Sequence, residues 1–354
     1  RGVYKLSADL TKKYENVRIK TSKYINSENE ENIVFTKSAT EAINLVASCF
    51  SEKYLNKGDE ILLSYLEHHA NIVPWQLAAE KKGFKIIAIN IDQEGQLDYE
   101  DFIQKVNSKT KFISITHMSN VLGTTINMQI IGDQAKKFNI PFLIDGCQYI
   151  AHAPVDVKSL DCDFYVYSGH KLYGPSGVGV LYMKNQWFNK FDPYQGGGDM
   201  IKNVDFKKTT FASGYKKFEA GTPPIVQVIG LGASYDFMSQ FNLQEIFKYE
   251  KDLYEYTVDK LQSFNDVNII GDSKNKGAIL SFTIDNIHTN DIGQILDQHN
   301  VAVRTGHHCA QPLLKKLNLN ATARASFGIY NNKNDVDCFI EAIKETKNFF
   351  KNNS

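Results

Sequence analysis

The chain of 354 residues is long enough for a large buried core and two domains. Its 40 Lys and Arg residues balance 40 Asp and Glu residues, so a dominant nucleic-acid or anionic-membrane surface is not expected. No apolar run reaches the roughly 18 residues that a membrane span needs.

In the first two thirds of the chain, short apolar runs alternate with longer helical patterns. The runs predict strands at 33–35, 61–63, 86–91, 112–115, 142–144, 164–167 and 178–183. Helices are expected between several of them, at 40–50, 71–82 and 130–138. Alternation at this spacing predicts an α/β domain with a mainly parallel, seven-stranded sheet flanked by helices.

From about residue 235 the pattern changes. A long, charged amphipathic helix is expected at 243–264, followed by a strand at 278–284, a helix at 291–299, a strand at 302–304 and a last helix at 335–350. We therefore predict two domains, a large domain of residues 1–236 and a smaller C-terminal α+β domain of residues 237–354.

Five cysteines are scattered along the chain, and none forms a C-x-x-C pair. An odd, low number argues against a disulfide framework or a cysteine-based zinc site, and no metal is expected. We expect four of the thiols to be small buried residues in a reducing compartment: Cys49, Cys147, Cys162 and Cys338.

A lysine follows the predicted strand at 164–167, in the glycine-rich segment Ser168-Gly-His170-Lys171-Leu-Tyr-Gly-Pro. Ligands of open α/β sheets sit at the carboxyl ends of strands. A lysine at such a position suits a Schiff base to an aldehyde cofactor. On spacing alone, a surface lysine in a turn explains the segment equally well.

A carboxylate ends another predicted strand, at Asp145 in Asp-Gly-Cys-Gln148. It can pair with a pyridinium nitrogen and keep such a ring electron-withdrawing. An Asp-Gly pair alone more often marks only a turn. The combination of Asp145 and Lys171, each at a strand end, is the better signal.

Two further segments follow strands. Ser38 or Thr40 can cap the helix that begins there, and the free N–H groups of a helix start suit a phosphate, although an ordinary cap needs no ligand. His68 and His69 are adjacent and so cannot form a two-histidine metal clamp on one helix face. One of them can stack on an aromatic cofactor, and the other is expected to be structural.

Eight motifs, in order, resemble those of the SufS-type (group II) cysteine desulfurases, which are class V aminotransferase relatives among the fold-type I pyridoxal-phosphate (PLP) enzymes. The resemblance covers the whole chain and is carried by EHHANIVPW at 67–75, HMSNVLGT at 117–124, DGCQ at 145–148, SGHKLYGPSG at 168–177, GGGDMI at 196–201, FEAGTP at 218–223, RTGHHCAQP at 304–312 and RASFGIYN at 324–331.

The resemblance implies a role for each matching residue. Lys171 would form the Schiff base with PLP and later move the substrate's Cα proton, while Asp145 pairs with the ring nitrogen. Gln148 would contact the ring hydroxyl, and His68 would stack on the ring. The phosphate would be bound by Thr40, Ser168 and His170, and by Thr222 of a second subunit in a homodimer. The substrate carboxylate would be held by Asn120, Arg304 and Arg324, because a planar guanidinium suits bidentate binding.

Cys309 follows two histidines in Arg304-Thr-Gly-His-His-Cys309. Positive or proton-accepting neighbours favour the reactive thiolate, and the flanking Gly and Pro suggest an exposed loop. The motif favours a catalytic role, in which Cys309 takes the sulfur of L-cysteine as a persulfide and alanine leaves. The compact segment fits the short ordered loop of group II enzymes.

The resemblance further implies a SufE- or SufU-like acceptor protein and a role in iron–sulfur cluster assembly by the SUF system. In relatives, several dozen residues precede the position of Arg1. A bacterial cytoplasmic location is expected, or an organelle stroma or matrix if a preceding segment carries a transit peptide. Two alternatives stay open: a selenocysteine lyase on the same fold, and a catalytically silent scaffold for sulfur-transfer proteins.

Overall fold

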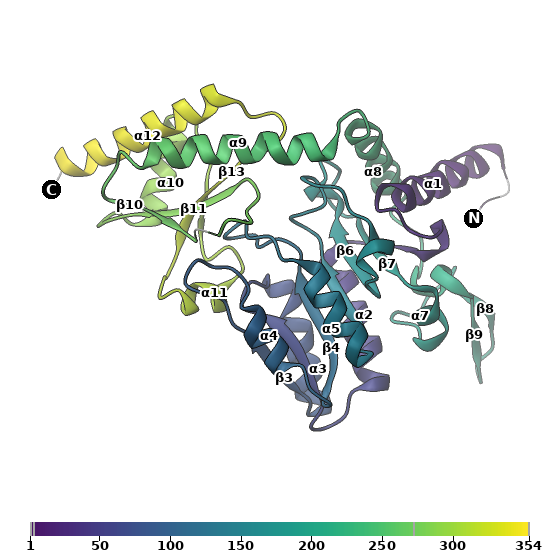
Figure 1. Ribbon diagram of the computed structural model, residues 1–354. Helices are drawn as coiled ribbons and strands as arrows, with labels where there is room; N and C mark the ends of the chain where they lie inside the picture. The colour runs from purple at the N-terminus through teal and green to yellow at the C-terminus, as the bar shows by residue number, and fades with distance from the viewer. Residues whose placement is uncertain (1, 3, 272, 353–354) are drawn as a thin grey trace.

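The computed structural model describes residue 2 and residues 4–271 and 273–352. A seven-stranded sheet forms the centre of the larger part, with the strand order β1-β7-β6-β5-β4-β2-β3 (Figure 1). Its strands are β1 (Ile33–Thr36), β2 (Glu60–Ser64), β3 (Lys85–Ile89), β4 (Thr110–Thr116), β5 (Phe142–Asp145), β6 (Phe164–Ser168) and β7 (Gly179–Met183).

Only β7 runs against the others, because it pairs antiparallel with both β1 and β6, while the remaining pairs are parallel. The carboxyl ends of the six other strands therefore lie at one edge of the sheet. Helices cover both faces: α1 (Lys5–Tyr24), α2 (Ala39–Tyr54), α3 (Val73–Lys82), α4 (Tyr99–Lys105), α5 (Met128–Phe138), α6 (Val157–Leu160), α7 (Asn185–Lys190) and α8 (Ile225–Met238). The prediction of an α/β fold with a mainly parallel seven-stranded sheet is confirmed.

The start of α2 shows how local sequence sets this edge. Ser38 accepts a hydrogen bond from the backbone N–H of Glu41 at 3.3 Å, and the Glu41 carboxylate accepts one from the N–H of Lys37 at 2.6 Å. This reciprocal arrangement satisfies N–H groups that have no partner inside the helix. The helix therefore begins immediately after β1, at the edge where the parallel strands end.

The smaller part is an antiparallel sheet in the order β10-β11-β13-β12. Its apolar core includes residues of the three helices that pack with it (Figure 1). These elements are β10 (Val267–Ile270), β11 (Ile279–Ile284), β12 (Arg304–Gly306), β13 (Thr322–Ser326), α9 (Leu243–Leu261), α10 (Thr289–Gln298) and α12 (Lys333–Asn352). The boundary between a large domain of residues 1–236 and a small domain of residues 237–354 stays a proposal.

One segment of the C-terminal part packs on the core of the large sheet. α11 (Gln311–Lys316) buries Leu313 and Leu314 in the same apolar cluster as residues of β2, β4 and β5. The turn that precedes α11 contains Cys309 and is therefore held between the two sheets.

Several helices and strands begin or end at residues other than those expected from the sequence. The helix expected at 71–82 begins with a 3-10 turn, η2 (His69–Asn71), and continues as α3. The strand expected at 302–304 is β12, displaced to Arg304–Gly306, because only these residues pair with β13. A hairpin of β8 (Ile201–Val204) and β9 (Thr209–Phe211), which was not expected from the sequence, projects from the body (Figure 1).

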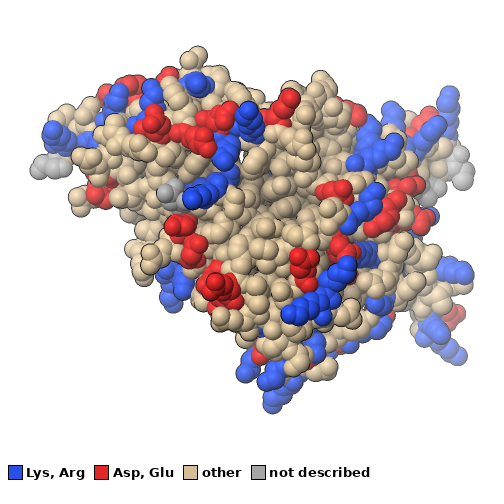
Figure 2. All heavy atoms as spheres, in the orientation of Figure 1, with Lys and Arg blue, Asp and Glu red and all other residues tan. Residues whose placement is uncertain are grey.

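Acidic and basic side chains are interspersed over the face shown in Figure 2. This agrees with the equal numbers of acidic and basic residues in the chain. Among the described helices, none is long and apolar enough to cross a membrane.

Gly179 allows β7 to approach the start of α2, and we expect its replacement to be costly. A Cβ atom at this position would lie 2.3 Å from the carbonyl carbon and 2.6 Å from the Cα of Ser38, and backbone atoms cannot rotate away. Gly179→Ala should therefore lower the free energy of unfolding by about 1–3 kcal/mol, measured by urea denaturation. Gly196→Ala is the matched control, because nothing lies within 4 Å of the added Cβ. Equal stability of the two variants would contradict the packing argument.

Candidate active site

A pocket opens at the edge where the parallel strands end. Its empty volume is about 620 Å³, which includes open solvent at its mouth. Its walls come from the start of α2, the ends of β4, β5 and β6, the loop after β2, and β12. The lining residues are Ala39, Thr40, His68, Ala70, Thr116, Met118, Asn120, Asp145, Cys147, Gln148, Ser168, His170, Lys171 and Arg304.

Lys171 lies in a 3-10 turn, η3 (Gly169–Lys171), directly after β6. Burial lowers the pKa of its amine, and the positive charges of Arg324 and Arg304 lower it further. A lowered pKa raises the fraction of neutral amine, which is the form that attacks an aldehyde. The position and the electrostatics therefore suit a Schiff-base lysine.

Asp145 is the last residue of β5 and is buried. Its Oδ1 accepts a hydrogen bond from the N–H of Cys147 at 3.0 Å, which fixes the carboxylate at the pocket wall. His68 lines the same pocket, and its Nδ1 accepts a hydrogen bond from the N–H of Ala70 at 3.0 Å. Burial is the main cause that lowers the pKa of His68. The imidazole that lines the pocket is therefore favoured in its neutral form.

The remaining wall suits an anion. The N–H of Ala39, at the start of α2, donates to Ser168 Oγ at 2.9 Å, which ties the helix start to the end of β6. Thr40, Ser168 and His170 all line the pocket at this point. The dipole at a helix start favours a phosphate, and the side chains of Thr40, Ser168 and His170 offer it polar partners, so these groups could hold one.

Two guanidinium groups approach the pocket from the small sheet. Arg304 and Arg324 are directly paired residues of β12 and β13, and Arg324 Nη1 donates to the carbonyl oxygen of Asn120 at 2.7 Å. Burial and the charge of Arg304 lower the pKa of Arg324 to about 10. Within the described part of the chain, neither guanidinium has a carboxylate within 4.0 Å, and Arg324 Nε and Asn120 Oδ1 are buried without partners. These groups suit an anionic substrate such as an amino acid.

Cys309 lies in the turn between β12 and α11, half-buried rather than fully exposed. His308 and Cys309 both have left-handed backbones, with φ of 53° and 56°, which costs non-glycine residues energy and persists only when neighbours hold it. The Nδ2 of Asn120 donates to the His308 carbonyl at 2.7 Å, and the N–H of His69 donates to the Cys309 carbonyl at 2.7 Å. Arg304 Nη2 lies 3.7 Å from Cys309 Sγ.

The structure thus brings together nearly all the residues singled out in the sequence. Thr222 is the exception: it is exposed and borders a different pocket, with Tyr14 and Phe35. The roles assigned to these side chains stay predictions.

The other cysteines follow expectation only in part. Cys49 and Cys162 are buried, as predicted. The prediction for Cys338 was wrong, because this residue lies on the exposed side of α12. Cys147 is half-buried in the pocket wall, where burial and the charge of Asp145 raise the pKa of its thiol.

One residue makes more contacts at this site than its sequence context indicates. His69, expected to be merely structural, contacts the Cys309 turn through both its backbone and its ring. The adjacent pair of histidines was the available signal, but it did not show that the two rings face different sites.

The fold and the pocket define a class V aminotransferase. The model of the family described as aminotransferase class-V matches residues 1–339, and the chain belongs to this family. A cysteine desulfurase of Wigglesworthia glossinidia brevipalpis is 41% identical over 353 residues, which cover 99% of this chain and 86% of that protein. A probable cysteine desulfurase of Halalkalibacterium halodurans is 41% identical over 350 residues, with the same coverage.

Solved structures agree. The cysteine desulfurase CsdA of Escherichia coli superimposes with a TM-score of 0.93 at 34% identity, covering 99% of this chain and 87% of that one. The apo cysteine desulfurase of Thermococcus onnurineus NA1 superimposes with a TM-score of 0.94 at 37% identity, covering 98% of this chain and 86% of that one. The resemblance to cysteine desulfurases is confirmed, while membership of the SufS-type subgroup stays a prediction.

Proposed function

We propose that this chain is a PLP-dependent cysteine desulfurase that converts L-cysteine to L-alanine and takes the sulfur as a persulfide on Cys309. One observation carries the proposal: Cys309 Sγ lies beside Arg304, which lines the same pocket as Lys171 and Asp145. A sulfur acceptor and a cofactor-binding lysine are therefore parts of one site.

The pocket residues fit the cofactor by the chemistry of their donors. Lys171 offers an amine to its aldehyde, Asp145 a carboxylate to its ring nitrogen, and the start of α2 a phosphate site. Gln148 and His68 would contact the ring hydroxyl and the ring face. When bound, PLP supplies an electron sink for the electrons released at the substrate's Cα.

The chain's own residues would carry the reaction as follows. Arg304, Arg324 and Asn120 hold the substrate carboxylate, and the Lys171 amine takes the proton from Cα. The Cys309 thiolate attacks the substrate's sulfur, the carbon–sulfur bond breaks with its electron pair remaining on carbon, and a new sulfur–sulfur bond forms. One proton delivered to that carbon and one returned to Cα from Lys171 complete alanine, and the persulfide stays on Cys309.

The direct experiment is to load the protein with PLP, add L-cysteine, and measure alanine and sulfide with and without a thiol reductant. We expect alanine in at most a stoichiometric first burst without an acceptor, and continued turnover with the reductant. No alanine would contradict the desulfurase proposal, and alanine from L-selenocysteine alone would favour the selenocysteine lyase alternative.

The product must pass from Cys309 to another molecule. Cys309 is half-buried in a turn held by several hydrogen bonds, which supports a dedicated acceptor over free diffusion of sulfide. We propose a SufE- or SufU-like acceptor protein that supplies sulfur to iron–sulfur cluster assembly by the SUF system.

A homodimer is also proposed, with Thr222 reaching the phosphate of the partner's cofactor. The exposure of Thr222 and its position outside the pocket of its own chain support this. Light scattering should give twice the 40.1 kDa of one chain. A monomer that still binds PLP tightly would contradict the dimer.

Mixed dimers test the same proposal more sharply. Thr222→Ala should weaken PLP binding about tenfold or more, since it removes a hydrogen bond to a charged group. When Lys171→Ala and Thr222→Ala chains are mixed, one site per mixed dimer regains both residues, so activity should recover. If mixing restores nothing, Thr222 does not act across an interface.

A further inference from the structure

The segment Glu67-His68-His69-Ala70-Asn71 lies between the cofactor pocket and the sulfur-accepting turn. Its two histidines face different neighbours. His68 lines the cofactor pocket, whereas His69 borders a separate surface groove between α3 and α11. Only His68 has a role in the reaction proposed above, so the contacts of His69 need their own explanation.

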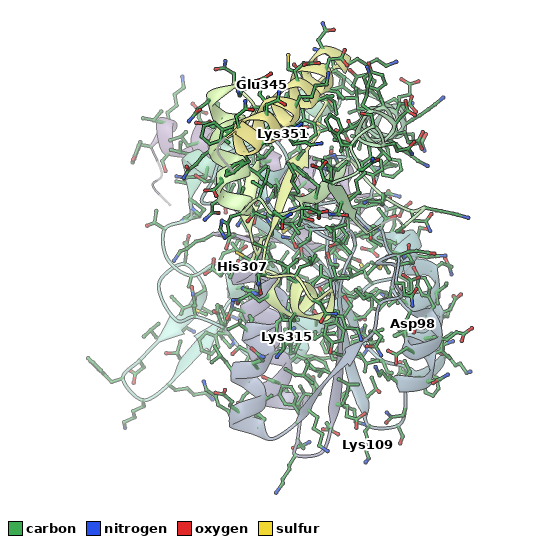
Figure 3. All side chains as sticks on the ribbon, turned by 90° about the vertical axis from the view of Figure 1, so that its left-hand side faces the viewer. Asp98, Lys109, His307, Lys315, Glu345 and Lys351 are labelled. Atoms are coloured by element: carbon green, nitrogen blue, oxygen red, sulfur yellow. The ribbon has the colours of Figure 1, made fainter. Side chains whose placement is uncertain are left out.

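His69 holds the Cys309 turn at two points. Its backbone N–H donates to the carbonyl oxygen of Cys309 at 2.7 Å. Its ring Nε2 accepts a hydrogen bond from the N–H of Gln311, the first residue of α11, at 3.0 Å. The ring also lies 5.9 Å, between centroids, from the ring of His307 on the other side of the turn. Figure 3 shows His307 on the same face of the molecule as Lys315 of α11.

The segment itself is anchored in the large sheet. Glu67 is fully buried, and its carboxylate accepts hydrogen bonds from Ser64 Oγ, from the N–H of Thr116 at 3.0 Å and from Asn71 Nδ2 at 2.7 Å. Asn71 Oδ1 in turn accepts a hydrogen bond from Ser114 Oγ at 2.6 Å. Both ends of the segment are therefore fixed to β2 and β4, and His69 projects from a rigid base.

The turn needs such support, because His308 and Cys309 both have left-handed backbones. A turn released from its contacts would relax, and Cys309 Sγ would lose its position beside Arg304. A displacement of about 1 Å at a reacting atom is enough to slow a reaction strongly.

We propose that His69 is a positioning residue for Cys309: its ring holds the start of α11 and its backbone holds Cys309, so that the thiol stays aligned with the cofactor pocket. This inference rests on the proposed desulfurase function. On this proposal, the segment 67–71 positions both His68, which lines the cofactor pocket, and Cys309, which accepts the sulfur.

The ring must be neutral to act in this way, because Nε2 can accept the Gln311 N–H only when it carries no proton. Burial and the neighbouring His307 lower the pKa of His69, which favours the neutral form. The other charged groups that border the groove are Lys315 and Lys316. Lys316 is held by Asn90 Oδ1 at 3.2 Å and lies over the Tyr65 ring.

Two substitutions distinguish the positioning role of the His69 ring from the effect of its volume alone. His69→Leu keeps much of the ring's volume and the backbone N–H but removes the acceptor, whereas His69→Gln places a neutral acceptor at a similar reach. In a single turnover with L-cysteine, we expect persulfide on Cys309 to form about fivefold to tenfold more slowly in His69→Leu, the loss that one hydrogen bond accounts for. His69→Gln should restore most of the rate.

The visible spectrum of bound PLP and its affinity should stay as in the unchanged protein in both variants, because His68, Asp145 and Lys171 are untouched. Gln76→Leu is the matched control, since Gln76 borders the same groove without a hydrogen bond to the turn. A normal persulfide rate in His69→Leu, an equal loss in His69→Gln or in Gln76→Leu, or a loss of PLP binding would each overturn the proposal. The absence of alanine from the unchanged protein would instead overturn the desulfurase function.

Discussion

Lys171→Ala is expected to abolish the visible absorbance of the PLP–protein Schiff base and to lower alanine formation by at least about 10³-fold, since both covalent binding and proton transfer are lost. The reason lies in the position of Lys171. It is the lysine of a glycine-rich turn at the carboxyl end of β6, where burial and two arginines lower the pKa of its amine. Absorption spectra and alanine assays after incubation with PLP measure both effects.

Lys184→Ala is the appropriate control for this prediction. Lys184 also directly follows a strand, but β7 is antiparallel to its neighbours, so Lys184 lies at the opposite edge of the sheet. Its amine contacts the carbonyl oxygen of Asp161 at 2.6 Å, outside the pocket. This variant should keep the spectrum and the activity. An unchanged spectrum in Lys171→Ala would remove the basis of the cofactor assignment.

The sequence predicted the large sheet well because its strands, apart from the half-buried edge strand β3, are almost entirely buried. Short runs such as 61–63 and 142–144 are apolar at every position and lie between helices, a pattern typical of parallel sheets. All seven strands of the sheet were expected near their observed positions. The reversed direction of β7 is set by tertiary pairing with β1 and β6, which no local pattern encodes.

Two of the elements that were missed lack such a pattern. α1 carries few apolar residues, and its buried side includes Arg18, which is paired with Glu219 at 2.7 Å and stacked over the Tyr215 ring. The hairpin of β8 and β9 is mostly exposed, with no alternation between buried and exposed residues. Packing against distant segments, rather than local periodicity, stabilises these parts.

The candidate site was predictable where a side chain lies at or just after the end of a strand, as Asp145 and Lys171 do. Contacts between the two sheets were not predictable. The pairing of Arg304 with Arg324 depends on the register of β12 and β13, and the bond from Gln311 to His69 joins residues far apart in the sequence. The exposure of Cys338 also follows from the way α12 packs, which the cysteine's type alone does not indicate.

Cys309→Ser should separate cofactor chemistry from sulfur transfer, because Lys171 with PLP activates the substrate while Cys309 accepts its sulfur. A serine hydroxyl is nearly the same size as the thiol but a far poorer attacker on sulfur, since the thiolate is the competent nucleophile. The variant should still bind PLP and respond spectrally to L-cysteine. Its formation of alanine should fall by at least about 10²-fold, the scale of losing a nucleophile.

Mass spectrometry of the L-cysteine-treated protein locates the sulfur directly. We expect one extra sulfur atom on the peptide that contains His307-His308-Cys309 in the unchanged protein, and none in Cys309→Ser. Activity on L-selenocysteine should survive in part, because selenium is the better leaving group and has less need of the thiolate. The other four cysteines, changed singly to Ala or Ser, are the controls and should leave turnover largely intact, including Cys147 in the pocket wall and the exposed Cys338. Extra sulfur on Cys147 or Cys338 instead of Cys309, or full desulfuration of L-cysteine by the Cys309→Ser protein, would show that another group accepts the sulfur.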